Sequence, residues 1–181
     1  MITHSPYRSW CPHCVAARRP NSQHRSSSSE SQRVDPLLVA DYCFVRDNDD
    51  AEVITILVAR LYPSRAMLAT VVDAKGPDEH AVSRLAKFLK DSGYAKVVYR
   101  SDQERSIVKL FEETFKASCR EGTPLHNSVL TQMVPEASAV GESQSNGKDE
   151  NAVQKFEDLL RTYKSALETH LDCSIPVDHP I

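Results

Sequence analysis

Blocks of apolar residues along the chain predict secondary-structure elements in the order β-β-β-α-β-α-β-α. The blocks that predict strands occupy residues 37–45, 53–61, 66–73, 96–100 and 127–134. Apolar residues at helical spacing predict three helices. The first begins after the break at residues 75–78 and ends at Gly93, and the second covers residues 104–119. The third closes the domain and has apolar positions at residues 153, 156, 160, 163 and 167. The first three strands follow one another without a helix, which predicts an antiparallel meander.

The strand predicted at residues 37–45 carries a single acid, Asp41, among apolar and aromatic residues. A carboxylate in such a strand is costly unless a cation or hydrogen-bond donors meet it. A divalent metal is one candidate partner for Asp41. The alternative is an acid at a strand edge that backbone donors satisfy.

Two further acids fall where elements begin or end. Asp102 follows the strand at residues 96–100, and Glu150 is expected at the start of the last helix, behind a polar loop over residues 135–147. In an open α/β sheet such positions converge at one edge, and three oxygen ligands suit Mg²⁺ or Mn²⁺. Asp102 could instead cap the following helix, and Glu150 could be favoured by the helix dipole alone.

The N-terminal region differs in composition from the rest. Residues 1–15 predict a turn-rich knuckle in which Cys11 and Cys14 have the spacing of half a zinc site, with His4 as a candidate third ligand. The alternative is a small apolar knuckle with two free thiols. Residues 16–35 read as a basic, flexible linker. Residues 1–33 carry a net charge of +4, which leaves −7 for the remainder of a chain whose total is −3.

Composition narrows the class of protein. With 181 residues and 40% hydrophobic content, the chain can form one domain with appendages, expected at residues 36–172 and followed by a tail at 173–181. No apolar run is long enough for a membrane span, and the first residues do not resemble a signal peptide, so we expect an intracellular protein of the nucleus or cytoplasm. Outside the Cys pair, Cys43, Cys119 and Cys173 are predicted to be buried.

The element order and three short motifs resemble a known family. Asp41-Tyr42, SDQE at residues 101–104 and SNGKDE at residues 145–150 are similar to the catalytic core of retrotransposon and retroviral integrases. THSPYRSWCPHC at residues 3–14 is similar to the tail of the zinc-binding region that precedes that core in long-terminal-repeat retroelements. The resemblance implies a ribonuclease H-like α/β fold with a five-stranded mixed sheet flanked by helices.

The resemblance also implies an activity and its ligands. Asp41, Asp102 and Glu150 would be the catalytic triad that holds Mg²⁺ or Mn²⁺, two ions in that family, for DNA 3′-end processing and strand transfer. Element ends and target DNA would be the partners, with a homo-oligomer as the assembly and Zn²⁺ at the N-terminal Cys pair. Candidate contacts to the DNA backbone are Lys148, Lys155, Arg161 and Lys164, although a solvated helix face explains them equally well.

Two other functions fit the same residues. The first is a catalytically inactive, integrase-derived remnant that binds nucleic acid or a protein partner, which the Lys148-Asp149 pair before Glu150 favours. The second is a ribonuclease H-type nuclease that cuts without joining. The Ser-Asn-Gly loop and the Cys-x-x-Cys segment argue against the second.

Overall fold

The computed structural model describes residues 8–17, 35–46, 53–100, 104–126, 129–136 and 143–176, and of residues 143–150 it describes the backbone alone. The chain forms five strands and four helices within these ranges: α1 (Pro12–Ala16), β1 (Leu37–Val45), β2 (Ile54–Tyr62), β3 (Ala66–Val72), α2 (Glu79–Ser92), β4 (Lys96–Arg100), α3 (Arg105–Cys119), β5 (Gln132–Pro135) and α4 (Ser143–Leu171).

The five strands form a single mixed sheet in the order β3-β2-β1-β4-β5. The strands β1, β2 and β3 pair antiparallel, and β4 and β5 continue the sheet parallel to β1. This confirms the predicted meander and places β1 at the centre. The strand order and directions are those of a ribonuclease H-like fold, as predicted.

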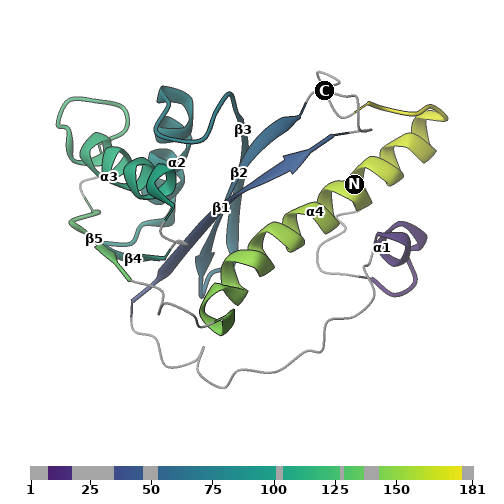
Figure 1. The fold of residues 1–181 in the computed structure, drawn as a ribbon, viewed down its shortest axis with the longest axis horizontal. Coiled ribbons are helices and arrows are strands. Elements are labelled where there is room, and N and C mark those ends of the chain that lie inside the picture. Colours follow the sequence, from purple (N-terminus) through teal and green to yellow (C-terminus); the bar gives the residue numbers. More distant parts are fainter. Residues whose placement is uncertain are drawn as a thin grey trace.

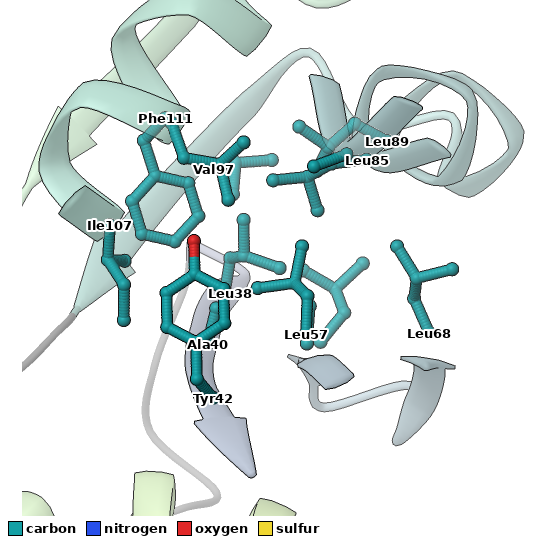
Figure 2. Packing of buried hydrophobic residues seen from close by; sticks show 14 of the residues in the cluster. Leu38, Ala40, Tyr42, Leu57, Leu68, Leu85, Leu89, Val97, Ile107 and Phe111 are labelled. Atoms are coloured by element: carbon teal, nitrogen blue, oxygen red, sulfur yellow. The ribbon is translucent and has the colours of Figure 1, made fainter. Parts of the chain in front are cut away.

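Helices cover both faces of the sheet (Figure 1). Alternate residues of β1 point to opposite faces. Leu38, Ala40 and Tyr42 pack in one apolar cluster with α2 and α3, whereas Leu37, Val39 and Cys43 pack in a second cluster with Ala152 of α4. The first cluster is the larger one, and Figure 2 shows Phe111 and Ile107 of α3 beside Val97 and Tyr42. Because β1 is covered on both faces, it is apolar at almost every position.

The ends of α2 follow from its sequence. The Asp78 side chain accepts a hydrogen bond from the Ala81 backbone N–H at 2.8 Å, which caps the first turn. Gly93 ends the helix with a φ of 71°, a left-handed conformation that glycine adopts without a steric penalty. Both ends were predicted from the sequence.

Three local predictions were wrong. The segment predicted as turns contains a short helix, α1, because Pro12 at its first position favours a helix start. Helix α4 begins at Ser143, so the Ser-Asn-Gly motif lies inside the helix and Glu150 is in its third turn. Strand β5 begins at Gln132, five residues later than predicted.

The short helix α1 packs beside the C-terminal half of α4 (Figure 1). The His13 Nδ1 atom and the Ser165 hydroxyl lie 3.0 Å apart in a hydrogen bond between the two helices. No helix in the described ranges is long and apolar enough to cross a membrane.

Candidate active site

Asp41 lies in the middle of β1, opposite Val58 of β2. Val39 and Cys43, two residues to either side of Asp41, lie on the face of the sheet that α4 covers. Because side chains alternate along a strand, Asp41 lies on that same face. The side chain is partly exposed, and its Oδ1 accepts a hydrogen bond from the Tyr42 backbone N–H at 2.7 Å. An acid inside an otherwise apolar strand face is the feature that the sequence predicted.

The other two members of the predicted triad are placed less completely. Asp102 lies outside the described residues, two positions after the end of β4 at Arg100. The backbone of Glu150 lies in α4, but its side chain is outside the described part, as is that of Lys148. Arg100 pairs with Val39, so β4 ends beside the part of β1 that leads to Asp41. Helix α4 packs on β1. The three elements expected to form the site are therefore neighbours.

Glu157 is an acid of this region that the sequence analysis did not select. Burial, together with the charges of Glu157 and Asp41, raises the pKa of the Cys43 thiol to about 12. Both carboxylates therefore lie within electrostatic range of one thiol. Glu157 follows Glu150 by seven residues, which is two helical turns, so both positions belong to the same stripe of α4. Helical spacing from Glu150 would have identified it.

The raised pKa of Cys43 makes stability depend on pH. The pKa of the thiol is near its ordinary value of 9 in the unfolded chain and about 12 in the folded protein. The folded state is thus stabilised fully below pH 9, and we expect this stability to fall by about 1.4 kcal/mol per pH unit between pH 9 and 12. Urea unfolding at pH 8 and pH 10.5 measures it.

A Cys43→Val variant should lose this pH-dependent component, and the matched variant of an exposed thiol, Cys119→Val, should retain it. An unchanged pH dependence in Cys43→Val would contradict the assignment. The exposure of Cys119 and Cys173 corrects the prediction that both are buried. Cys119 lies beside the buried stripe of α3 rather than on it, and Cys173 follows the end of α4.

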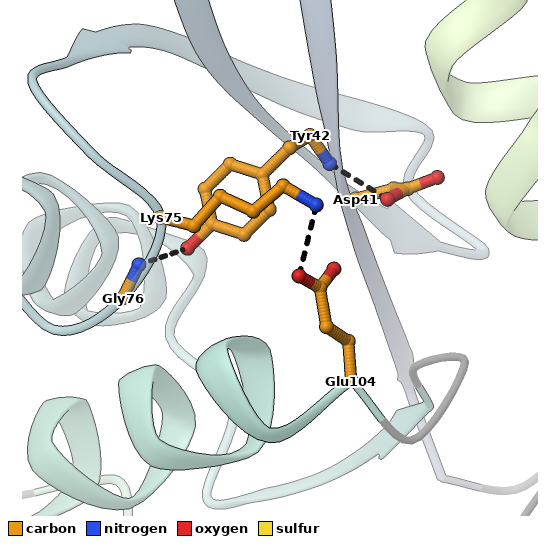
Figure 3. A network of polar contacts seen from close by, with 5 residues as sticks. All are labelled: Asp41, Tyr42, Lys75, Gly76 and Glu104. Carbon is orange, nitrogen blue, oxygen red and sulfur yellow. Dashed lines mark hydrogen bonds and ion pairs between the residues drawn. The ribbon is translucent and has the colours of Figure 1, made fainter.

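A polar network occupies the opposite face of β1 at the same level (Figure 3). The Tyr42 hydroxyl accepts a hydrogen bond from the Gly76 backbone N–H at 3.0 Å. Lys75 Nζ donates to Glu104 Oε1 at 2.8 Å and lies over the rings of Tyr42 and Phe44. The hydrogen bond from Lys75 lowers the pKa of Glu104, which directly precedes α3. These contacts join the segment after β3 to the start of α3.

Two arginines that the sequence did not single out flank β1 on the α4 face, Arg60, which is buried, and Arg100, which is partly buried. Arg60 of β2 and Arg100 of β4 both pair with Val39. The Arg100 guanidinium forms an ion pair with Glu136 at 2.9 Å. Arg60 Nη1 donates to Asn151 Oδ1 of α4 at 3.0 Å. Arg60 was visible in the sequence as a charged residue within an apolar strand, but its partner Asn151, 91 residues away, was not.

Two of the four basic residues predicted to contact DNA are paired with acids on their own helix. Arg161 lies 2.7 Å from Asp158 and 3.7 Å from Glu157, and Lys164 lies 4.0 Å from Glu168. Lys155 is exposed. These contacts fit the alternative reading, a solvated helix face, at Arg161 and Lys164.

The N-terminal Cys pair is buried, with Cys11 and Cys14 each 4% exposed. A hydrogen bond from the Cys14 backbone N–H lowers the pKa of the Cys11 thiol. A thiolate is the form that binds a metal. His4 lies outside the described residues. Within the described ranges, no three histidine, cysteine, aspartate or glutamate side chains gather closely enough to hold a metal ion.

The strand order, the strand directions and the helices on both faces of the sheet are those of a ribonuclease H-like α/β fold. Comparison with solved structures finds a chain of the simian T-cell lymphotropic virus intasome in complex with PP2A regulatory subunit B56 gamma, with a TM-score of 0.51 and 11% sequence identity. The match covers 93% of this chain and 53% of that chain, so it spans about half of its length. At this identity the likeness shows the fold alone. No family model and no curated protein matches the sequence.

Proposed function

We propose that this chain is an integrase-like catalytic domain that processes DNA 3′ ends and joins them to target DNA. The observation that carries the proposal is Asp41, an acid in the central strand on the face that α4 covers. Helix α4 also contains Glu150, and β4 ends beside β1 just before Asp102. The intasome chain with a similar fold supports the same class of reaction.

The proposed ligands of the metal are the carboxylates of Asp41, Asp102 and Glu150. Carboxylate oxygens suit Mg²⁺ or Mn²⁺, and the partly exposed position of Asp41 fits a ligand that solvent and substrate also reach. When bound, two such ions would activate the attacking hydroxyl and stabilise the leaving oxygen. In end processing the attacking oxygen comes from water, and the P–O3′ bond of the cleaved phosphodiester breaks to leave a 3′-hydroxyl. In strand transfer it is the DNA 3′-hydroxyl, which forms a new P–O bond as the target P–O3′ bond breaks.

The chain itself would supply position and charge rather than a nucleophile. Strand β1 and helix α4 are held together by apolar packing around Val39 and Ala152, which holds the backbone positions of Asp41 and Glu150 relative to one another. DNA ends and target DNA are the proposed partners. A second copy of the chain is a further proposed partner, on the basis of the resemblance to integrases. Zn²⁺ at Cys11 and Cys14, with His4, is a separate proposal supported by the lowered pKa of Cys11.

A joining assay tests the proposal. The wild-type chain is incubated with Mn²⁺, a labelled duplex that ends in a 3′-hydroxyl and a plasmid target. We expect labelled plasmid from the wild type, and a fall of about 100-fold or more in the Asp102→Asn and Glu150→Gln variants, because each would remove a metal ligand. An Asp73→Asn variant, which changes an exposed acid after β3, should join as the wild type does.

Two companion measurements on the same variants, cleavage of a labelled RNA–DNA hybrid and binding of labelled DNA, separate the alternatives. Cleavage of an RNA–DNA hybrid without joining would indicate a ribonuclease H-type nuclease. DNA binding with neither cleavage nor joining would indicate a non-catalytic, integrase-derived remnant. One observation favours this remnant as the second candidate: Arg161 and Lys164, proposed to contact the DNA backbone, are already paired with acids of α4.

A further inference from the structure

Arg60 is a buried cation on the face of the sheet that carries Asp41. It lies in β2 opposite Val39, two residues along β1 from Asp41, and is 9% exposed. Its guanidinium carbon lies 5.1 Å from the centre of the Tyr62 ring. Burying a guanidinium is costly unless its donors are satisfied, and the Arg60 Nε atom has no hydrogen-bond partner among the described residues. Such a cost suggests that this arginine has a role beyond packing.

The hydrogen bond of Arg60 reaches the part of α4 that carries the third proposed ligand. Arg60 Nη1 donates to Asn151 Oδ1 at 3.0 Å, and Asn151 directly follows Glu150. Neighbouring contacts between α4 and the sheet, at Ala152, Val153 and Phe156, are apolar. Apolar packing is non-directional, whereas a hydrogen bond specifies an angle as well as a distance. The Arg60–Asn151 bond can therefore fix the rotation of this turn of α4 over β1 and β2.

We propose that Arg60 is a positioning residue that sets the metal affinity of the site by fixing the turn of α4 that carries Glu150 relative to Asp41. This inference rests on the proposed function. Arg60 acts through Asn151 and touches neither substrate nor metal. Residues that orient metal ligands in this way typically change metal affinity by about 10- to 100-fold when they are removed.

The test is calorimetric titration of the full chain with Mn²⁺. Arg60→Met keeps most of the apolar length but removes the donors, and Asn151→Leu removes the acceptor. We expect each variant to bind Mn²⁺ at least about 10-fold more weakly than the wild type, and the double variant to bind no more weakly than either single one, because both remove the same bond. Asn151→Asp keeps an acceptor oxygen and should bind at least as tightly as the wild type.

A charge-matched control is Arg84→Met, which removes an exposed arginine from α2 on the other side of the sheet. It should leave Mn²⁺ affinity unchanged. If Arg60 acted only through its charge, Arg60→Met would strengthen Mn²⁺ binding and Asn151→Leu would not change it, which would overturn the inference. Lower melting temperatures with unchanged Mn²⁺ affinity would overturn it as well, because the role would then be structural.

The inference and the proposed function can fail separately. If the wild type binds Mn²⁺ through Asp41 and the variants bind equally well, the positioning role is wrong and the proposed function stands. If the wild type binds no Mn²⁺, the proposed function fails and the positioning role fails with it. Amide hydrogen exchange of residues 151–156 without metal then shows whether the bond orders α4, since Arg60→Met should raise exchange there.

Discussion

An Asp41→Asn variant is expected to lose Mn²⁺ binding and to become more stable in metal-free buffer. Asp41 is an acid on an otherwise apolar stretch of β1, and Glu157 carries a second negative charge within electrostatic range of the same Cys43 thiol. A carboxylate in an apolar strand is costly to desolvate, and a second negative charge that acts on the same thiol adds to the negative charge of this region. Replacing Asp41 by a neutral amide of the same shape should therefore raise the free energy of unfolding by about 0.5–2 kcal/mol.

The loss of Mn²⁺ affinity in Asp41→Asn should be larger than the loss in Arg60→Met. Removal of a residue that only orients a ligand weakens metal binding by about 10- to 100-fold, so removal of the central ligand should exceed about 100-fold. Titration calorimetry and thermal unfolding on the same samples measure both effects. Asp73→Asn removes an exposed acid and should change neither quantity. A stabilised Asp41→Asn variant that still bound Mn²⁺ like the wild type would place the metal elsewhere.

A Phe111→Ala variant is expected to lower the free energy of unfolding by about 3–5 kcal/mol. Phe111 is 1% exposed and belongs to the larger apolar cluster, where its ring centre lies 4.6 Å from that of Tyr99 in β4. Deleting the ring removes the contact that joins α3 to β4 and leaves a cavity between the helix and the sheet. Urea unfolding followed by far-ultraviolet circular dichroism measures the change.

Phe44→Ala is the matched control for Phe111→Ala. The Phe44 side chain is 53% exposed, and its ring lies beside the Lys75 ammonium group. We expect its removal to cost no more than about 1 kcal/mol, the size of an exposed cation–π contact. Comparable losses in the two variants would mean that the cluster between the sheet and α3 is not the main source of stability.

The fold was largely predictable because strong local signals agreed with one another. Strand β1 is apolar at eight of nine positions, which indicated a central strand buried on both faces. Asp78 and Gly93 marked the ends of α2 by their capping chemistry. Each signal depends on residues close together in sequence, and these are the features that a single sequence reveals.

The prediction failed where composition pointed away from the structure. Residues 143–147 are small and polar and include a glycine, which costs about 1 kcal/mol in a helix interior. They are nevertheless helical, because extending an existing helix costs much less than starting one. Pro12 suggested a turn, yet proline at the first helical position fits α1.

The candidate site was predictable only in part, because its contacts join distant residues. Asp41 stood out as a lone acid in an apolar strand, and it lies on the face of the sheet that α4 covers. The bond between Arg60 and Asn151 spans 91 residues, and the approach of Glu157 to Cys43 depends on how α4 lies over β1. Neither follows from periodicity within one element. Asp102 and the Glu150 side chain lie outside the described part, and the roles of all three acids stay predictions.

The most direct test of the account is to locate Mn²⁺ by anomalous diffraction in crystals of the wild-type chain. The account predicts a peak about 2.0–2.2 Å from an Asp41 carboxylate oxygen, with Glu150 as a second ligand. A peak held by other residues, or the absence of one at Asp41 in crystals saturated with Mn²⁺, would contradict it.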